Sequence, residues 1–139
     1  MRSKAKPGAF SITLLESNDA EDSQQIRQEA IQLAVEMRRM PGMISMMGIT
    51  NGNRRLTITA WEHAEDMDAL VKSTTHESAM AQAFRKHGLS QAVHVSSWVP
   101  IHQGTMWLRC GECGTMVDSN KLQVCSDCGA RLRESTAYW

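Results

Sequence analysis

Apolar and polar residues alternate along Phe10–Glu16. This period of two is typical of a strand with one buried face. Beyond a polar stretch, apolar residues return at helical spacing, at Ile26, Ala30, Leu33, Ala34, Met37 and Met40. The pattern predicts an amphipathic helix, and Pro41-Gly42 is expected to end it.

Two further strand-like segments, Met43–Thr50 and Arg55–Trp61, lie on either side of Asn51-Gly52. An Asn-Gly pair between two such segments is typical of a tight β-hairpin turn. We therefore expect these two strands to pair antiparallel.

The segment after the hairpin carries two short helical patterns with a break between them. Glu65–Val71 has its apolar residues on one helical side, and a Ser-Thr-Thr sequence follows. Thr74 and Glu77 have the spacing of a capping box, so we expect a second helix to begin there and to end at Gly88. Gln91–Val99 is then predicted as the last strand.

The predicted order is strand, helix, strand, strand, broken helix and strand. This order indicates an α+β, ferredoxin-like domain with the split βαβ arrangement, which we place at residues 8–101. Its antiparallel sheet would carry the helices on one face and leave the other face open. A second copy of the chain is the simplest cover, because a symmetric interface buries both open faces at once. We therefore predict a homodimer.

The charge balance limits the classes of partner. Lys plus Arg and Asp plus Glu number 15 each, so no net charge draws the chain to nucleic acid or to an anionic membrane. The basic first residues lack the apolar stretch of a signal peptide, and we find no transmembrane run. We expect a soluble, cytoplasmic protein. Its ten methionines suit either a flexible core or an adaptable pocket wall.

All four cysteines lie near the C-terminus, in two Cys-x-x-Cys-Gly pairs formed by Cys110 with Cys113 and Cys125 with Cys128. In a reducing compartment such thiols are better interpreted as metal ligands than as disulfides. Four thiolates suit a tetrahedral zinc ion and leave no position for water. We predict a structural zinc ribbon over residues 105–134 that is closed and not hydrolytic.

Iron is the alternative metal, because rubredoxin-like domains have nearly the same spacing and Trp107–Cys110 resembles their first strand. Thr115 and Met116 stand where an aromatic residue usually follows the first pair, and no proline lies between Cys125 and Cys128. Both departures favour zinc. The ribbon is electrically neutral, so we expect it to dock a protein, to support a dimer or only to stabilise the chain, and not to bind nucleic acid.

Three short motifs mark the first domain: Met40–Ser45 (MPGMIS), Thr57–Glu62 (TITAWE) and Ser73–His76 (STTH). Together with the hairpin, they resemble the antibiotic biosynthesis monooxygenase-like family of dimeric α+β barrels. The resemblance extends from Phe10 to Pro100 and implies a ligand pocket between the sheet and the helices. That family includes cofactor-free oxygenases of polyphenols and quinols, haem-degrading enzymes and members without a settled activity.

The haem-degrading branch of the family resembles this chain at Trp61. It has a second tryptophan where Leu70 stands here, and its haem-ligating histidine falls at Met80. Its pocket asparagine on the first strand has no counterpart in Phe10–Glu16. These departures argue against haem degradation by that mechanism. Looser haem binding through His76 or Met80 stays open.

The resemblance makes His76 the candidate catalytic base. Histidine titrates near neutral pH, and this one opens a helix beside the implied pocket. The N-terminus of a helix disfavours its protonated form. The candidate ligand-binding residues are Trp61, which could stack on a flat ring, Met80, and His94, which faces either the pocket or the dimer interface.

These observations predict a monooxygenase-like protein that acts on a small aromatic or quinol substrate without a cofactor, beside a structural zinc site. Two alternatives stay open. One is a non-catalytic binding protein for an apolar ligand such as haem. The other is an assembly factor whose zinc ribbon docks a protein partner.

Overall fold

A computed structural model describes residues 5–134, apart from the side chains of Thr74 and Thr75. The chain divides into two compact units, with the boundary between Pro100 and Ile101. Each unit has its own sheet and its own buried cluster.

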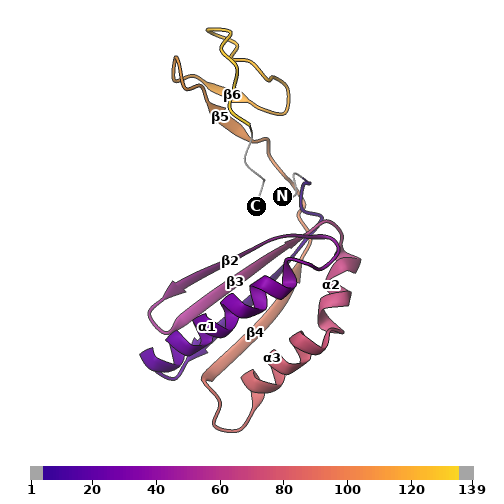
Figure 1. Ribbon diagram of the computed structural model, residues 1–139, viewed down its shortest axis with the longest axis vertical. Helices are drawn as coiled ribbons and strands as arrows, with labels where there is room; N and C mark the ends of the chain where they lie inside the picture. Colours follow the sequence, from indigo (N-terminus) through magenta and orange to yellow (C-terminus); the bar gives the residue numbers. More distant parts are fainter. Residues whose placement is uncertain (1–4, 135–139) are drawn as a thin grey trace. The chain divides into compact units, whose positions relative to one another are not determined.

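The first unit has the predicted α+β, ferredoxin-like fold (Figure 1). Its four strands pair antiparallel in the order β2-β3-β1-β4, so β3 separates β1 from β2 as a split βαβ unit requires. The helical segment after the hairpin is broken in two, as predicted. The elements are β1 (Ala9–Ser17), α1 (Ala20–Met37), β2 (Met43–Asn51), β3 (Arg54–Trp61), α2 (Ala64–Val71), α3 (Thr74–Phe84) and β4 (Ser90–Trp98).

Both predicted ends of α3 need correction. The N-cap is Ser73 and not Thr74, because the Ser73 hydroxyl accepts a hydrogen bond from the backbone N–H of His76 at 3.2 Å. The helix ends at Phe84, ahead of Gly88. After the helix, His87 has φ at 56° and takes the left-handed conformation that commonly follows a helix end.

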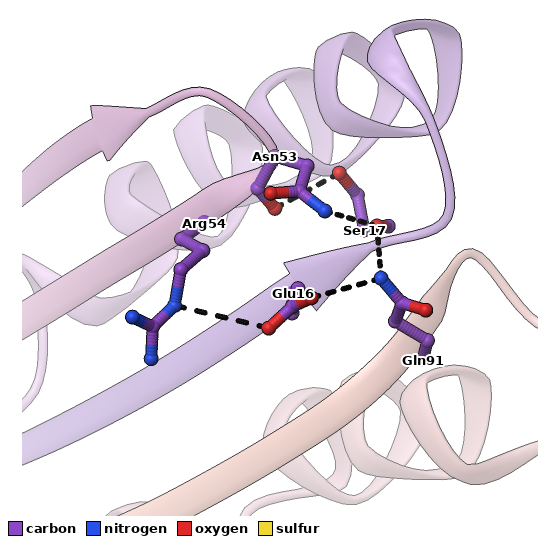
Figure 2. Close-up of polar contacts among 5 residues, drawn as sticks. All are labelled: Glu16, Ser17, Asn53, Arg54 and Gln91. Atoms are coloured by element: carbon purple, nitrogen blue, oxygen red, sulfur yellow. Dashed lines mark hydrogen bonds and ion pairs between the residues drawn. The ribbon is translucent and has the colours of Figure 1, made fainter.

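A polar cluster fastens three strands together at one end of the sheet (Figure 2). The buried hydroxyl of Ser17 donates to the Asn53 carbonyl at 3.0 Å, and the Asn53 side chain donates back to the Ser17 carbonyl at 3.3 Å. Gln91 donates to Glu16 at 2.9 Å, and Arg54 lies 3.8 Å from the same carboxylate. These contacts join the hairpin and β4 to the end of β1.

The two faces of the sheet differ in polarity. The register of the strands places several small polar side chains on the face that α1, α2 and α3 cover, among them Ser11, Thr13, Thr57 and Thr59. The opposite face is mainly apolar and carries Phe10, Ile12, Leu14, Met47, Ile49, Leu56, Ile58 and Trp98. On that face Met47 is 47% and Ile49 is 49% exposed, so the single protomer leaves apolar surface uncovered.

The core of the first unit lies toward the end of the sheet where β3 stops. Met37, Trp61 and Leu70 are its buried members. The partly buried residues packed against them are Leu33, Met40, Met43, Met46 and Met67. Methionine therefore supplies most of this packing, which agrees with the flexible-core interpretation of the composition.

The second unit is built on two short antiparallel strands, β5 (Trp107–Arg109) and β6 (Met116–Asp118). Leu108 and Val117 point inward from them and are almost fully buried. Among the residues that the structure describes, no helix is long and apolar enough to cross a membrane.

Candidate functional sites

The four cysteine sulfur atoms form a compact cluster in the second unit, all within 4.8 Å of one another. The Sγ atoms of Cys110 and Cys128 are 3.6 Å apart, and those of Cys113 and Cys125 are 3.5 Å apart. Four thiolates about 2.3 Å from one zinc ion in a tetrahedron would lie about 3.8 Å from each other. The measured separations are close to that value, so this cluster could hold one tetrahedral metal ion.

Each of the two cysteine pairs forms the same kind of backbone turn. The N–H of Gly114 donates to the Cys110 carbonyl at 3.1 Å, and the N–H of Gly129 donates to the Cys125 carbonyl at 3.0 Å. Gly114 has φ at 79° and Gly129 has φ at 73°, in the left-handed region where a Cβ atom causes strain. This is why a glycine follows each pair in the sequence.

The electrostatics of the cluster suit a bound cation. Hydrogen bonds to the hydroxyl and then to the backbone of Thr115, together with those to the Cys125 and Cys128 sulfurs, lower the pKa of Cys113 to about 6. The backbone N–H of Ala130 also acts to lower the pKa of Cys128, but the neighbouring sulfur atoms and burial raise it to about 12. Four sulfur atoms this close therefore keep a proton among them unless a metal ion replaces it.

A second candidate site is a cavity of ≈ 530 Å³ between the sheet and the helices of the first unit. This volume is in the range of small-molecule sites. Its floor is the covered face of the sheet, which contributes the hydroxyl groups of Ser11, Thr13, Thr57 and Thr59. Its walls are largely apolar and include Ile26, Leu33 and Met37 from α1 and Ala79, Met80 and Ala83 from α3. A flat apolar molecule with polar groups on one edge would suit this lining.

His76 and Met80 both line the cavity. The Ser73 cap fixes the first turn of α3, which places His76 on the side of the helix that faces the sheet. Met80 follows one turn later on the same side. The fold thus brings these two predicted residues to one wall, while their functional roles stay predictions.

The other two predicted ligand-binding residues lie elsewhere. Trp61 is 0% exposed in the core, outside the cavity lining, and its indole N–H donates to the Thr59 hydroxyl at 2.8 Å. It therefore supports the cavity through Thr59. His94 is exposed on β4 and pairs with Leu14 on the open face, whereas its neighbour Val93 lines the cavity. Of the two faces open to His94 in the sequence analysis, the structure places it on the open face of the sheet, away from the cavity.

One cavity residue that sequence reasoning missed is Arg55, at the start of β3. Burial, and then the like charge of Arg27, lower the pKa of this guanidinium. Across the sheet lies Gly48, where a Cβ atom would come within 2.1 Å of Nη2 of Arg55. Gly48 pairs with Thr57, two residues from Arg55 on the neighbouring strand, and a glycine inside a strand is the signal that could have drawn attention to this pair.

No protein-family model matches the sequence, and no curated protein matches it either. Several solved structures match the first unit. One is a candidate antibiotic biosynthesis monooxygenase from Deinococcus radiodurans, with a TM-score of 0.63 and 15% identity over 70% of this chain and 97% of that one. Another is SnoaB, a cofactor-independent oxygenase from Streptomyces nogalater, with a TM-score of 0.58 and 10% identity over 68% of this chain and 94% of that one.

A third similar structure is the haem-degrader MhuD from Mycobacterium tuberculosis, with two haems bound in its active site. Its TM-score is 0.51, at 14% identity over 69% of this chain and 98% of that one. At such identities the similarity concerns the fold alone. The first unit of this chain has the fold of the antibiotic biosynthesis monooxygenase-like proteins, and the second unit adds a cysteine cluster suited to a metal ion.

Proposed function

We propose that the first unit is a monooxygenase-like domain that acts on a small aromatic or quinol substrate in the cavity, without a cofactor. The observation that carries this proposal is the position of His76 on the wall of a cavity whose other walls are largely apolar. The fold that the domain shares with a cofactor-independent oxygenase supports the class of reaction.

In this proposal His76 takes a proton from a phenolic hydroxyl of the substrate. The neutral imidazole is the form that accepts this proton. The resulting anion supplies the electrons that reduce O₂. One oxygen atom enters the ring as a carbonyl, and the other leaves as water with the hydrogens from the substrate. The apolar walls keep bulk water from the reacting atoms.

Oxygen consumption with a naphthoquinol tests the assignment. We expect His76→Ala to lower kcat about 100-fold or more, because a positioned base contributes about that much. His102→Ala is the matched control, since His102 is exposed and outside the cavity, and its turnover should be unchanged. Unchanged turnover in His76→Ala would remove the catalytic role.

A non-catalytic role as a binding protein for an apolar ligand is the second candidate. His76 and Met80, side by side on α3, are the two residue types that ligate haem iron in cytochromes. Titration with haemin would shift the Soret band if this candidate is correct, and His76→Ala or Met80→Ala would reduce the shift. A spectrum that equals that of free haemin would eliminate haem as the ligand.

We propose Zn²⁺ as the ion in the cysteine cluster, in a structural role, with iron as the alternative. The sulfur separations and the filled set of four cysteines support a closed site. Elemental analysis of protein purified without added metal decides between the two ions. A ferric tetrathiolate site would also make the protein red, whereas a zinc site is colourless.

The third candidate is an assembly factor whose ribbon docks a partner. Trp107 and Met116 support it, because they are 54% and 44% exposed on the outward side of β5 and β6. Removing residues 105–139 should then abolish co-purifying complexes and leave the cavity intact. Unchanged complexes would contradict this role.

We propose further that two copies of the chain pair through the open face of the sheet. The apolar side chains that the single protomer leaves exposed there support this arrangement. Burying both faces in one symmetric interface would remove that surface from water.

A further inference from the structure

Arg55 has an unusual environment for a charged side chain. Its Nε atom is buried and has no hydrogen-bond partner among the described residues. Its Nη1 atom donates to the Thr50 hydroxyl at 3.2 Å. None of the ion pairs formed by the described residues involves Arg55. The positive charge of Arg27 repels the Arg55 guanidinium and, after burial, lowers its pKa. A partly buried cation without a counter-charge costs folding free energy.

The opposite strand makes room for this cation. A Cβ atom at Gly48 would lie 2.1 Å from Nη2 and 2.7 Å from Cζ of Arg55, so the guanidinium occupies the space above the glycine. Glycine inside a strand weakens the strand, because it costs backbone entropy and packs no side chain. Two unfavourable features therefore meet beside the cavity, where Arg55 contributes to the lining.

We propose that Arg55 is an anion-binding residue, and that the cavity takes a flat apolar molecule that carries an anionic oxygen group, such as a carboxylate or a phenolate. The free Nε–H and a neighbouring N–H of the guanidinium form a donor fork for such a group. The apolar helix walls would hold the body of the molecule. Glu29 and Glu36 also line the cavity, but both are exposed, so they lie at its rim, where water screens them.

This inference rests on the proposed ligand site in the cavity and not on oxidation of the ligand. It is tested with two fluorescent probes on the full-length protein. The anionic probe is 8-anilinonaphthalene-1-sulfonate, and the neutral one is N-phenyl-1-naphthylamine, which has the same rings without the sulfonate. A charge-assisted pair of hydrogen bonds should give the anionic probe about tenfold higher affinity or more.

Three substitutions assign that preference to Arg55. Arg55→Met should lower the affinity for the anionic probe about tenfold and change the affinity for the neutral probe by less than about twofold. Gly48→Ala keeps the charge but displaces the guanidinium, and it should act in the same direction. Arg54→Met is the matched control, because Arg54 is the neighbouring cation, lies near Glu16 and does not line the cavity. The Tm of Arg55→Met should equal or exceed that of the wild type, since an unpaired buried cation is removed.

Ala79→Phe distinguishes the failure of this inference from that of the proposed function. Ala79 lines the cavity, so a phenylalanine there should fill it and weaken both probes. If both probes weaken in Ala79→Phe but Arg55→Met changes neither, the anion inference is overturned and the cavity remains the ligand site. If Ala79→Phe changes neither probe, the probes bind elsewhere and both proposals fail. A marked fall in the Tm of Arg55→Met would show a structural role for Arg55 and overturn the inference.

Discussion

Three glycines of this chain serve two different physical purposes. Gly114 and Gly129 supply a left-handed backbone conformation that lets each cysteine pair turn around a common centre. Gly48 supplies space for the Arg55 guanidinium in a strand. The first purpose was visible in the sequence as the glycine after each Cys-x-x-Cys. The second was not, because it depends on which side chain lies across the sheet.

Gly114→Ala and Gly111→Ala isolate the effect of backbone conformation within the cysteine module. A Cβ atom would meet nothing within 4 Å at either position, and only Gly114 has positive φ. We expect Gly114→Ala to cost about 1–2 kcal/mol and to weaken Zn²⁺ binding about tenfold. Gly111→Ala should change the affinity for Zn²⁺ by less than about twofold. Competition with a chromophoric chelator measures both, and equal losses would contradict the explanation.

Ser17 is the buried centre of the polar cluster that joins β1 to the hairpin. Its hydroxyl lies 3.0 Å from the Asn53 carbonyl and 3.1 Å from the Asp19 carbonyl, which share its one hydrogen. Ser17→Ala should therefore lower the free energy of unfolding by about 1–2 kcal/mol in urea titrations. Ser97→Ala, at an exposed position of β4, should change it by less than about 0.5 kcal/mol. A neutral Ser17→Ala would show that the cluster contributes little to stability.

At the scale of elements, hydrophobic periodicity predicted the strands and helices in the right order. Their boundaries differ by a few residues where capping decides them. The first residue of α3 follows from the Ser73 hydroxyl, which acts one position before the predicted cap at Thr74. Helix α1 begins at Ala20 behind the Asp19 cap, ahead of the first apolar residue of its pattern. Caps act through single hydrogen bonds, which the apolar pattern does not reveal.

The open face of the sheet leads to a prediction about assembly. Ile49→Asp places a carboxylate on the apolar open face that would form the proposed interface, so the homodimer should dissociate into monomers. Val71→Asp is the control, because Val71 is 61% exposed on α2 and its substitution should leave the dimer intact. Light scattering coupled to size-exclusion chromatography gives the mass of each variant. A monomeric wild-type protein would contradict the proposed pairing.

For the whole molecule, the division into two compact units separates two kinds of stabilisation. The first unit has a core around Trp61 that apolar burial can stabilise. The second unit has a small cluster that includes Cys110, Val117 and Cys125. We expect a cluster of that size to need bound metal to stay folded.

Metal removal should therefore affect the two units differently. In NMR spectra after treatment with a strong chelator, amide signals of residues 105–134 should lose dispersion while those of residues 9–98 keep it. Cys110→Ser should reproduce this result without the chelator, and Ser126→Ala should not. Acidification should act like the chelator, because protons compete with the metal for the thiolates, so the stability of the second unit rises with pH. A simultaneous loss in both units would contradict independent stabilisation.

Sequence by itself determined the cysteine cluster and the order of elements, because ligand spacing and residue periodicity are local properties of the chain. Through the family resemblance it also offered His76 and Met80 as candidates, which the fold brings to one wall of the cavity. Tertiary structure decided which face of the sheet the helices cover. The alternation of apolar and polar residues along a strand shows which residues share a face, but it does not show what packs on that face. Tertiary structure also decided the exclusion of Trp61 from the cavity lining and the meeting of Arg55 with Gly48. Both depend on pairing between strands, which brings distant residues together at one site.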